Sequence, residues 1–449
     1  MKEIHDSHEA VTIIMPVYNP GKYLAPCMES LLAQTFRDFR IIAIDDGSTD
    51  GSGGDVLRAY AAQDARILAW RNPENLGAAR TRNIGIQMAR GEYLAVVDAD
   101  DIYEPTYLEL LLEAMEHHHA DVVECDFISR DEQTGEESVA CYPRVPFCDA
   151  GPVISTSIHM TYLFCIAYCN PFVHLVRRSF VSRHALQFQD ISSNNDVYFA
   201  RMLLFLTEKW IHIATPLVIH RRQTGNQIST NRHKHPENAI RALAHIKETL
   251  EQLHLFDGFR NAFHDGAVLG FINAEFLPAY EKFGATVLPA LQRGLHDLGM
   301  SQLERSDFSS PLAYFRWRSW IQGMPPGQKN GMPETYQEFF DVLAKCGKAV
   351  ALWGYGKLGK RFLQEAECCG FQVTEVYDND ASKWDAEAAP PVKGFEKREM
   401  SVEIIVVTNS RFYEDICRQI QAIAPRIRVI DFSAYCQWGY FPVAWKPQS

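Results

Sequence analysis

The sequence predicts an α/β protein in which buried strands alternate with amphipathic helices. Continuous apolar runs occur at 11–15, 40–44, 66–70, 93–97 and 121–125. Stretches with the spacing of apolar residues that is typical of helices separate these runs. The runs do not alternate apolar with polar residues, which favours a largely parallel sheet covered by helices on both faces. A composition of 47% hydrophobic and 22% charged residues indicates a globular protein.

The predicted helices lie between the strands, one in each of the four intervals. They span residues 24–34, 56–62, 78–89 and 106–118. Pro105 immediately precedes the last of them, and proline is favoured in the first turn of a helix. Regular alternation of this kind is how consecutive βα units appear in a sequence.

The length of 449 residues favours about two to four domains. Turn residues interrupt the pattern at 130–153, and a second mixed section ends in a polar, basic loop at 220–235. Helical spacing then dominates to about residue 303, and 309–331 has the composition of a linker. We predict a first domain at 1–235 with halves 10–128 and 129–235, a helical region and linker at 236–332, and a smaller α/β domain at 333–449.

Charge and hydropathy exclude several classes of protein. The net charge of -12, with no local basic patch, argues against a nucleic-acid partner. Residues 1–10 lack the features of a signal peptide, and the longest apolar run, 160–169, is too short to cross a membrane. Eleven cysteines occur without a C-x-x-C pair, which favours reduced thiols. We therefore expect a cytoplasmic protein, with peripheral attachment to the inner face of the cell membrane left open.

Carboxylates gather at the carboxyl ends of the predicted strands, the edge at which open α/β sheets bind ligands. The second strand runs into Asp45 and Asp46, and the fourth into Asp98, Asp100 and Asp101. Several carboxylates at one edge repel each other unless a cation neutralises them. Mg²⁺ or Mn²⁺ prefers such oxygen ligands. Each motif alone has a simpler interpretation as a turn or a helix cap.

The order and spacing of the motifs resemble those of the family-2 glycosyltransferases. The similarity is close over about residues 10–130 and looser to about residue 230. The matching segments are V-T-I-I-M-P-V-Y-N at 11–19, S-L-L-A-Q-T-F at 30–36, D-D-G-S-T-D at 45–50, E-N-L-G at 74–77, R-N at 82–83, G-E-Y at 91–93 and D-A-D-D at 98–101.

This resemblance implies a GT-A fold, a nucleotide-diphospho-sugar donor and inversion at the anomeric carbon. It places Pro16, Tyr18 and Asp46 around the nucleotide, with Asp46 accepting a hydrogen bond from the base. Asp98 and Asp100 would form the Asp-x-Asp motif, with Asp98 near the nucleotide and Asp100 as the more direct ligand of Mn²⁺ or Mg²⁺.

Arginines near the donor form a second group of expectations. Arg82 lies early in a predicted helix, where a guanidinium and the helix N-terminus both favour phosphate. Arg80 is an extra cation, either a phosphate ligand or part of a solvated helix face. His220 and Arg221 resemble the start of the family's mobile loop over the donor phosphates, which would exclude water.

An inverting transferase needs a general base for the acceptor hydroxyl. Asp196 occupies the matching position in N-N-D-V-Y-F at 194–199 and is our candidate. Its alternative role is the N-cap of a helix beginning at Val197, and Asp190 is the alternative base. The Q-x-x-R-W motif of polymerising members is absent from the sequence, which favours addition of single sugars.

A glycine-rich turn marks the C-terminal domain. Gly354, Gly356 and Gly359 follow a predicted strand and open a predicted helix, and Asp378 ends the next strand. This context is typical of a Rossmann-like nucleotide site. A degenerate scaffold without ligand is an equal alternative.

We therefore expect a metal-dependent transferase that moves a sugar from a nucleotide donor, most simply a UDP-sugar, to a hydroxyl of a glycan or glycolipid in bacterial cell-surface polysaccharide synthesis. The alternative is a nucleotide-sugar sensor or an assembly scaffold. An oxidoreductase that uses the glycine-rich domain is a third hypothesis, but the sequence shows no catalytic residue for it. The apolar run at 162–172 has three alternative roles: it packs in a core, lines an acceptor site or forms a homodimer contact.

Overall fold

The computed structural model describes residues 9–140, 153–155, 169–225 and 234–323, and in the last part of the chain 339–341, 343–344, 349–383, 392–393, 402–408, 416, 419–420 and 427–432. The chain divides into two compact units. Of the described residues, the first unit contains 9–140, 153–155, 169–225, 234–260 and 274–301. The second contains Asn261–Asn273 and the residues from Gln302 onward.

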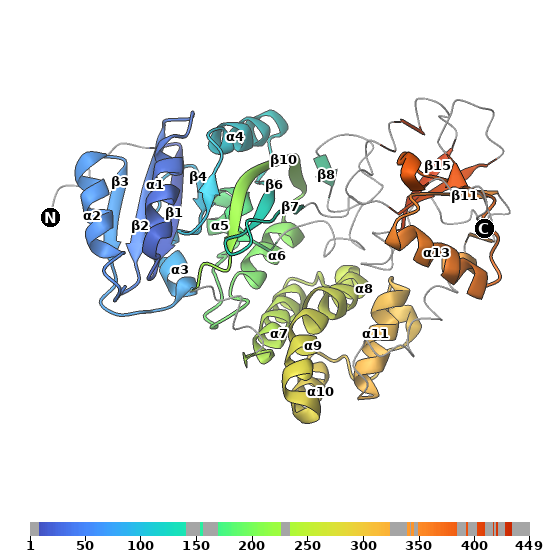
Figure 1. Ribbon diagram of the computed structural model, residues 1–449. Helices are drawn as coiled ribbons and strands as arrows, with labels where there is room; N and C mark the ends of the chain where they lie inside the picture. The colour runs from blue at the N-terminus through green and yellow to red at the C-terminus, as the bar shows by residue number, and fades with distance from the viewer. Residues whose placement is uncertain are drawn as a thin grey trace. The chain divides into compact units, whose positions relative to one another are not determined.

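The first unit is built on a mixed sheet of ten strands, in the order β3-β2-β1-β4-β9-β6-β10-β5, with β7 beside β6 and β8 beside β10. The strands are β1 (Val11–Val17), β2 (Phe39–Asp45), β3 (Ile67–Arg71), β4 (Tyr93–Val96), β5 (Ile102–Tyr103), β6 (Val122–Asp131), β7 (Glu137–Ala140), β8 (Val153–Ser155), β9 (His174–Arg177) and β10 (Lys209–Arg222). The blue strands of Figure 1 are the parallel series at its start.

The five predicted strands of the N-terminal half are all present. β1 pairs in parallel with β2 on one side and β4 on the other. β9 then inserts between β4 and β6 and is antiparallel to both. The sheet is therefore parallel where the βα pattern was regular and mixed beyond it, in agreement with the irregular sequence after residue 130.

The predicted helices also form. They are α1 (Leu24–Leu32), α2 (Gly54–Gln63), α3 (Ala78–Met88) and α4 (Tyr107–His118), followed by α5 (Arg178–Arg183) and α6 (Val197–Leu206). Apolar residues of α1, α2 and α4 share one core with the side chains of alternate strand positions. α3 packs on the other face, where a β-carbon at Gly85 would lie 2.3 Å from Ile14 Cγ2. Both faces of the sheet are thus covered.

Helices dominate the chain after the first sheet, as the sequence predicts. They are α7 (Glu237–Gln252), α8 (Phe256–Gly266), α9 (Asn273–Phe283), α10 (Leu288–Asp297) and α11 (Pro311–Ile321). The linker expected at 309–331 is wrong for its first part, because α11 begins there. Pro311 lies in its first turn, and Ser310 caps it by accepting a hydrogen bond from the backbone N–H of Ala313 at 3.2 Å.

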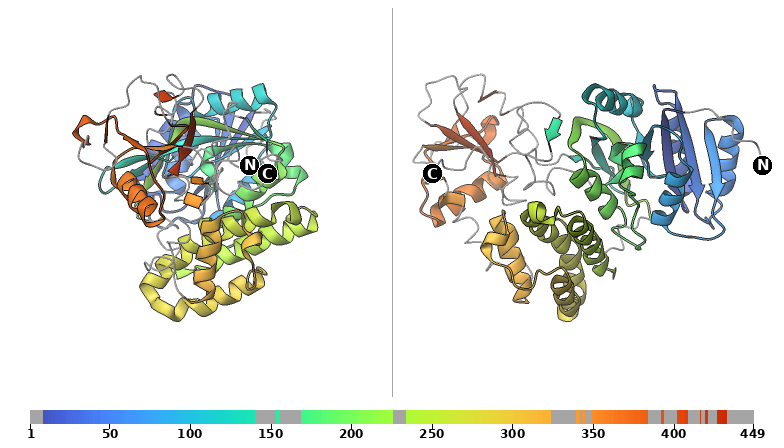
Figure 2. Two further views of the ribbon diagram at one scale, coloured as in Figure 1. Left: turned by 90° about the vertical axis from the view of Figure 1, so that its right-hand side faces the viewer. Right: turned by 180° about the vertical axis from the view of Figure 1, so that it is seen from behind.

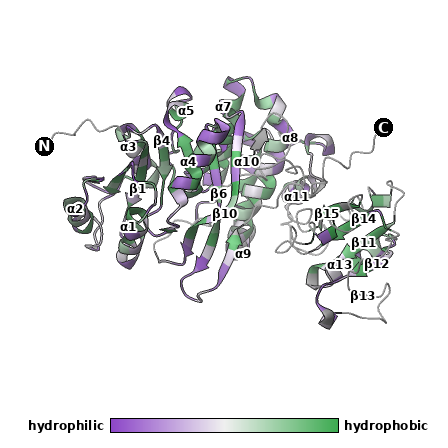
Figure 3. Ribbon diagram, turned by 90° about the horizontal axis from the view of Figure 1, so that it is seen from above, coloured by the Kyte–Doolittle hydropathy of each residue, from purple (hydrophilic) through white to green (hydrophobic). Residues whose placement is uncertain are grey.

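The second unit contains a smaller parallel sheet in the order β13-β12-β11-β14-β15. These strands are β11 (Val350–Trp353), β12 (Glu375–Tyr377), β13 (Val392–Lys393), β14 (Ile404–Val407) and β15 (Arg428–Asp431), and α13 (Lys357–Cys368) follows β11. Apolar side chains line both faces of the sheet, and Figure 3 shows the hydrophobic colouring of β11 and β14. Figure 2 gives two further views of these elements.

Two further findings concern the described residues alone. None of their helices combines the length and hydropathy needed to cross a membrane. Among their cysteines, Cys27, Cys125, Cys368 and Cys369 are free thiols.

Candidate active site

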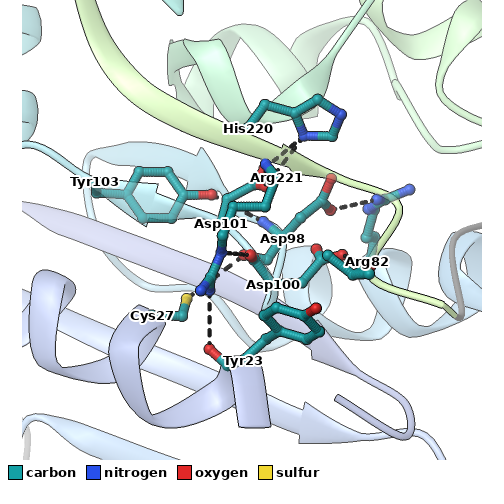
Figure 4. A network of polar contacts seen from close by, with 10 residues as sticks. Tyr23, Cys27, Arg82, Asp98, Asp100, Asp101, Tyr103, His220 and Arg221 are labelled. Atoms are coloured by element: carbon teal, nitrogen blue, oxygen red, sulfur yellow. Dashed lines mark hydrogen bonds and ion pairs between the residues drawn. The ribbon is translucent and has the colours of Figure 1, made fainter. Parts of the chain in front are cut away.

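The Asp98–Asp101 segment forms a turn directly after β4, at the edge of the sheet where the parallel strands end (Figure 4). Its backbone is held from two sides. The N–H of Asp98 donates to the Tyr103 hydroxyl at 3.0 Å, and the Cys27 thiol donates to the Asp98 carbonyl at 3.5 Å. Since the turn is fixed by its backbone, its carboxylates are presented at defined positions.

Asp98 and Asp100 are the partly exposed carboxylates of this turn. Asp98 Oδ1 accepts a hydrogen bond from Arg82 Nη2 at 2.8 Å, and Asp100 Oδ2 accepts one from the Thr224 hydroxyl at 3.0 Å. Burial raises the pKa of Asp100 above its usual value, and the negative charge of Asp98 adds to the effect. A cation beside Asp100 would offset both causes.

The donor set fits a hard divalent cation. Two carboxylates are what Mg²⁺ or Mn²⁺ commonly takes from a protein, with substrate phosphate and water supplying the other oxygens. Among the described residues no group of three or more His, Cys, Asp or Glu side chains has a geometry that could enclose a metal ion. Asp98 and Asp100 would therefore hold a cation together with a ligand, not in a closed protein cage.

Asp101 was not assigned a role from the sequence, yet it is the most buried residue of the turn, with no exposed surface. Its carboxylate accepts the backbone N–H of Arg221 at 2.9 Å and lies 3.1 Å from His220 Nδ1. Burial lowers the pKa of His220, but the charge of Asp101 and the hydrogen bond outweigh it and raise that pKa. Asp101 thus fastens the turn to β10.

His220 and Arg221 lie in a strand, which corrects the loop expected at 220–235. They are among the last residues of β10, where His220 pairs with Ser129 of β6 and the ladder continues through Arg222. The polar side chains of these residues favoured a loop prediction, whereas their backbone pairs with β6. Residues 226–233 of the expected loop lie outside the described residues.

Arg221 was predicted to contact donor phosphates, but its guanidinium lies against the protein (Figure 4). Its Nε donates to the carbonyl of Asp100, and its Nη2 donates to the carbonyl of Tyr23 at 3.1 Å. The guanidinium also lies 4.8 Å from the centre of the Tyr23 ring. Arg221 therefore stabilises the backbone of the Asp-x-Asp turn.

The residues predicted to surround the nucleotide occupy the same edge of the sheet. Pro16 is near the end of β1, and Tyr18 follows that strand with 45% of its surface exposed. Asp46 is buried, and its carboxylate accepts hydrogen bonds from the Asn72 amide at 2.8 Å and the backbone N–H groups of Leu76 and Gly77 at 2.9 Å. Asp46 therefore organises the loop before α3; its contact with a base stays a prediction.

Asp196 is the residue immediately before α6, but its side chain makes no capping hydrogen bond. The preceding residue, Asn195, accepts a hydrogen bond from Arg82 Nη1 at 3.0 Å. Arg82 therefore touches both the Asp-x-Asp turn and the segment that carries the candidate base. The alternative base, Asp190, instead pairs with Arg80, whose Nε lies 2.7 Å from its Oδ2; both side chains are more than half exposed.

The glycine-rich turn of the second unit joins β11 to α13. Gly354 has a φ of +108°, which favours glycine, and its carbonyl accepts the Thr408 hydroxyl at 2.8 Å. Asp378, at the end of β12, accepts the backbone N–H of Tyr355 at 2.7 Å. The predicted residues are therefore brought together, and Asp378 ties its strand to the turn.

Known proteins resemble this chain mainly in its first unit. The family model described as "Glycosyl transferase family 2" matches residues 12–170. Glycosyltransferase GlyG of Streptococcus pneumoniae is 40% identical over 127 residues, which are 28% of this chain and 42% of GlyG. EpsH of Bacillus subtilis is 31% identical over 225 residues, which are 47% of this chain and 60% of EpsH. The matches thus span about half the length of these relatives.

The crystal structure of Staphylococcus aureus TarS 1–349 has a similar fold. It gives a TM-score of 0.52 at 16% sequence identity and covers 70% of this chain and 87% of that one. At this identity the similarity concerns the fold. Together with the family match, it shows that the chain carries a family-2 glycosyltransferase domain with a GT-A fold.

Proposed function

We propose that the first unit is a metal-dependent inverting glycosyltransferase that moves a sugar from a UDP-sugar to a hydroxyl of a glycan or glycolipid. The observation that carries the proposal is the position of Arg82, which joins the Asp-x-Asp turn to the segment bearing Asp196. This link supports the proposal that Asp98, Asp100 and Asp196 act in one site. TarS 1–349 has a crystal structure in complex with UDP-GlcNAc, which supports trying UDP-sugars first.

The reaction needs a general base and a site for a cation from this chain. Asp196 takes the proton from the acceptor hydroxyl, whose oxygen then bonds to the anomeric carbon on the face opposite the leaving group. The bond between that carbon and the diphosphate oxygen breaks, and the nucleoside diphosphate leaves with the electron pair. Asp98 and Asp100 would hold Mn²⁺ or Mg²⁺. When bound, such an ion stabilises the negative charge of the leaving diphosphate.

The test combines binding with turnover. UDP with Mn²⁺ at about a hundred times its dissociation constant should stabilise the protein by about 2.7 kcal/mol, which a thermal-shift scan detects. Asp100→Ala should abolish the stabilisation that depends on the metal. Asp196→Asn should keep binding and lose sugar transfer. Binding with no turnover of any donor, in both wild-type protein and variants, would favour the sensor or scaffold instead.

The biological setting forms a further part of the proposal. We propose a cytoplasmic enzyme of bacterial cell-surface polysaccharide synthesis, acting alone or as a homodimer and in contact with the inner face of the membrane. The free thiols of Cys27, Cys125, Cys368 and Cys369 support a reducing compartment for the protein. Fractionation of cells producing the full chain tests it.

A second nucleotide site in the second unit is supported by the space around its glycines. A β-carbon at Gly359 would lie 1.8 Å from the Gly354 carbonyl oxygen, so this glycine permits close packing of α13. A β-carbon at Gly356 would meet nothing within 4 Å. This is the position at which a dinucleotide fold lets a pyrophosphate approach the backbone. We propose that Gly354, Gly356, Gly359 and Asp378 border a nucleotide, to be tested with UDP-sugars and NAD by isothermal titration.

A further inference from the structure

The loop at 188–196, which carries Asp196 at its end, is fastened to α3 at both of its ends. At its start, Asn83 of α3 exchanges two hydrogen bonds with the backbone of Phe188. Asn83 Nδ2 donates to the Phe188 carbonyl at 2.8 Å, and the Phe188 N–H donates to Asn83 Oδ1 at 2.8 Å. At its end, Arg82 donates to Asn195 at 3.0 Å. Two consecutive residues of one helix therefore set the position of the loop.

The attachment is rigid because it is buried and packed. Only 8% of the Arg82 side chain is exposed, and its guanidinium lies 5.2 Å from the centre of the Phe188 ring. The Phe188 ring in turn stacks on Phe199 of α6, with 4.3 Å between ring centres and 13° between planes. The loop thus contacts α3 at one side and continues into the helix that follows Asp196.

The loop is also closed on itself. The backbone N–H of Gln189 donates to the Asn195 carbonyl at 3.1 Å. Asn194 has a φ of +56°, a left-handed conformation that asparagine adopts more readily than most residues. Asn238 of α7 donates to the hydroxyls of Ser192 and Ser193 at 2.9 and 3.0 Å. These contacts join the loop to itself and to α7, independently of its attachments to α3.

We infer that Arg82 and Asn83 are positioning residues that fix Asp196 relative to the Asp98–Asp100 carboxylates. The inference rests on the proposed function and specifies how its two parts are aligned. Arg82 contacts both parts through Asp98 and Asn195, whereas the hydrogen bonds of Asn83 reach the loop alone. The two residues therefore have separable effects. Misplacement of a base by about 1 Å costs about a hundredfold in rate.

The experiment measures kcat for UDP release from UDP-GlcNAc, or from whichever UDP-sugar the wild-type protein turns over, and the Kd of UDP with Mn²⁺. Asn83→Ala should lower kcat by about 10- to 100-fold and leave the Kd of UDP within about twofold. Arg82→Lys should lower kcat and also weaken UDP binding, because it alters the partner of Asp98. Gln87→Ala, an exposed residue of the same helix, is the matched control and should change neither value.

Hydrogen exchange of residues 188–196 provides a readout that does not require activity. These amides should exchange faster in Asn83→Ala than in Gln87→Ala, while those of β4 stay protected. Asn83→Asp, which keeps the acceptor for the Phe188 N–H and loses the donor, serves if the alanine variant fails to fold. Unchanged exchange, an unchanged kcat, or equal losses in kcat and UDP affinity in Asn83→Ala would overturn the inference. If the wild-type protein turns over no donor, the proposed function fails, and exchange still decides the positioning role.

Discussion

His220 Nδ1 lies 3.1 Å from both carboxylate oxygens of Asp101, although 119 residues separate the two in the sequence. Asp101 is fully buried, and burial is the largest cause that raises its pKa; the charge of His220 acts in the opposite direction. The next residue, Arg221, donates a hydrogen bond to the carbonyl of Asp100. The end of β10 therefore supports the turn that presents Asp98 and Asp100.

Replacing Arg221 tests this support. Arg221→Lys keeps the positive charge but cannot reproduce the two hydrogen bonds that the planar guanidinium makes to Asp100 and Tyr23. We expect UDP binding in the presence of Mn²⁺ to weaken by about tenfold, the effect of losing about 1.4 kcal/mol. Isothermal titration measures it. Arg222→Lys, at the exposed neighbouring position, is the control, and equal affinities in the two variants would rule out a supporting role.

His212 should make stability depend on pH. It lies between two buried carboxylates, with Nδ1 3.0 Å from Glu124 and Nε2 3.1 Å from Asp126. Burial lowers the pKa of His212, but the hydrogen bonds and charges of Asp126 and Glu124 outweigh it and raise that pKa to about 9. In the unfolded chain the value is about 6.5. The folded state thus holds the proton more tightly.

The sign of the effect follows. The stabilisation by protonated His212 is complete below pH of about 6.5 and is lost as the pH rises through about 9, at up to about 1.4 kcal/mol per pH unit. Urea unfolding between pH 6 and 9.5 should show this fall in wild-type protein and a shallower one in His212→Gln. The exposed His296 provides the control variant, His296→Gln. Parallel curves for wild type and His212→Gln would contradict the assignment.

Local patterns were sufficient for the regular part of the fold. β1 and β2 were predictable as apolar runs, and α3 and α4 as stretches with helical spacing, because each buries a face whose period is visible in the sequence. β10 was harder to predict, since its last residues are polar and only the ladder with β6 reveals them as a strand. α11 was predicted as part of a linker, because prolines and glycines lie close to it in the sequence.

The site shows the same division. The position of Asp98 and Asp100 after β4 could be predicted, because they follow an apolar run in a recognisable motif. The role of Asp101 could not, because its partners come from β10, far along the chain. The attachment of Asn195 to Arg82 is equally non-local. Sequence patterns identify residues at the ends of elements, whereas contacts between distant elements require the fold.

The two candidate bases can be separated by substitution. Asp190 pairs with Arg80 at an exposed position, where ion pairs contribute little, and Asp196 follows the buried contact between Arg82 and Asn195. We expect Asp190→Asn to retain sugar transfer within a few-fold. Asp196→Asn should lower kcat by about 10²- to 10⁴-fold, the usual contribution of a general base. Steady-state rates with saturating donor measure both, and the reverse ranking would assign the base to Asp190.

The glycines of the second unit separate a packing role from a binding role. Gly359→Ala should destabilise this unit by about 3 kcal/mol or more, because the new β-carbon would lie 1.8 Å from a backbone oxygen that cannot move aside. Gly356→Ala should leave stability unchanged, since it meets nothing within 4 Å and Gly356 has a φ of −74° that alanine adopts. Hydrogen exchange across β11 and α13 measures both effects.

If the turn binds a nucleotide, Gly356→Ala should also weaken nucleotide binding to this unit, because its methyl group would occupy the space that a phosphate needs. Unchanged binding at unchanged stability would make the turn a packing device for α13 alone.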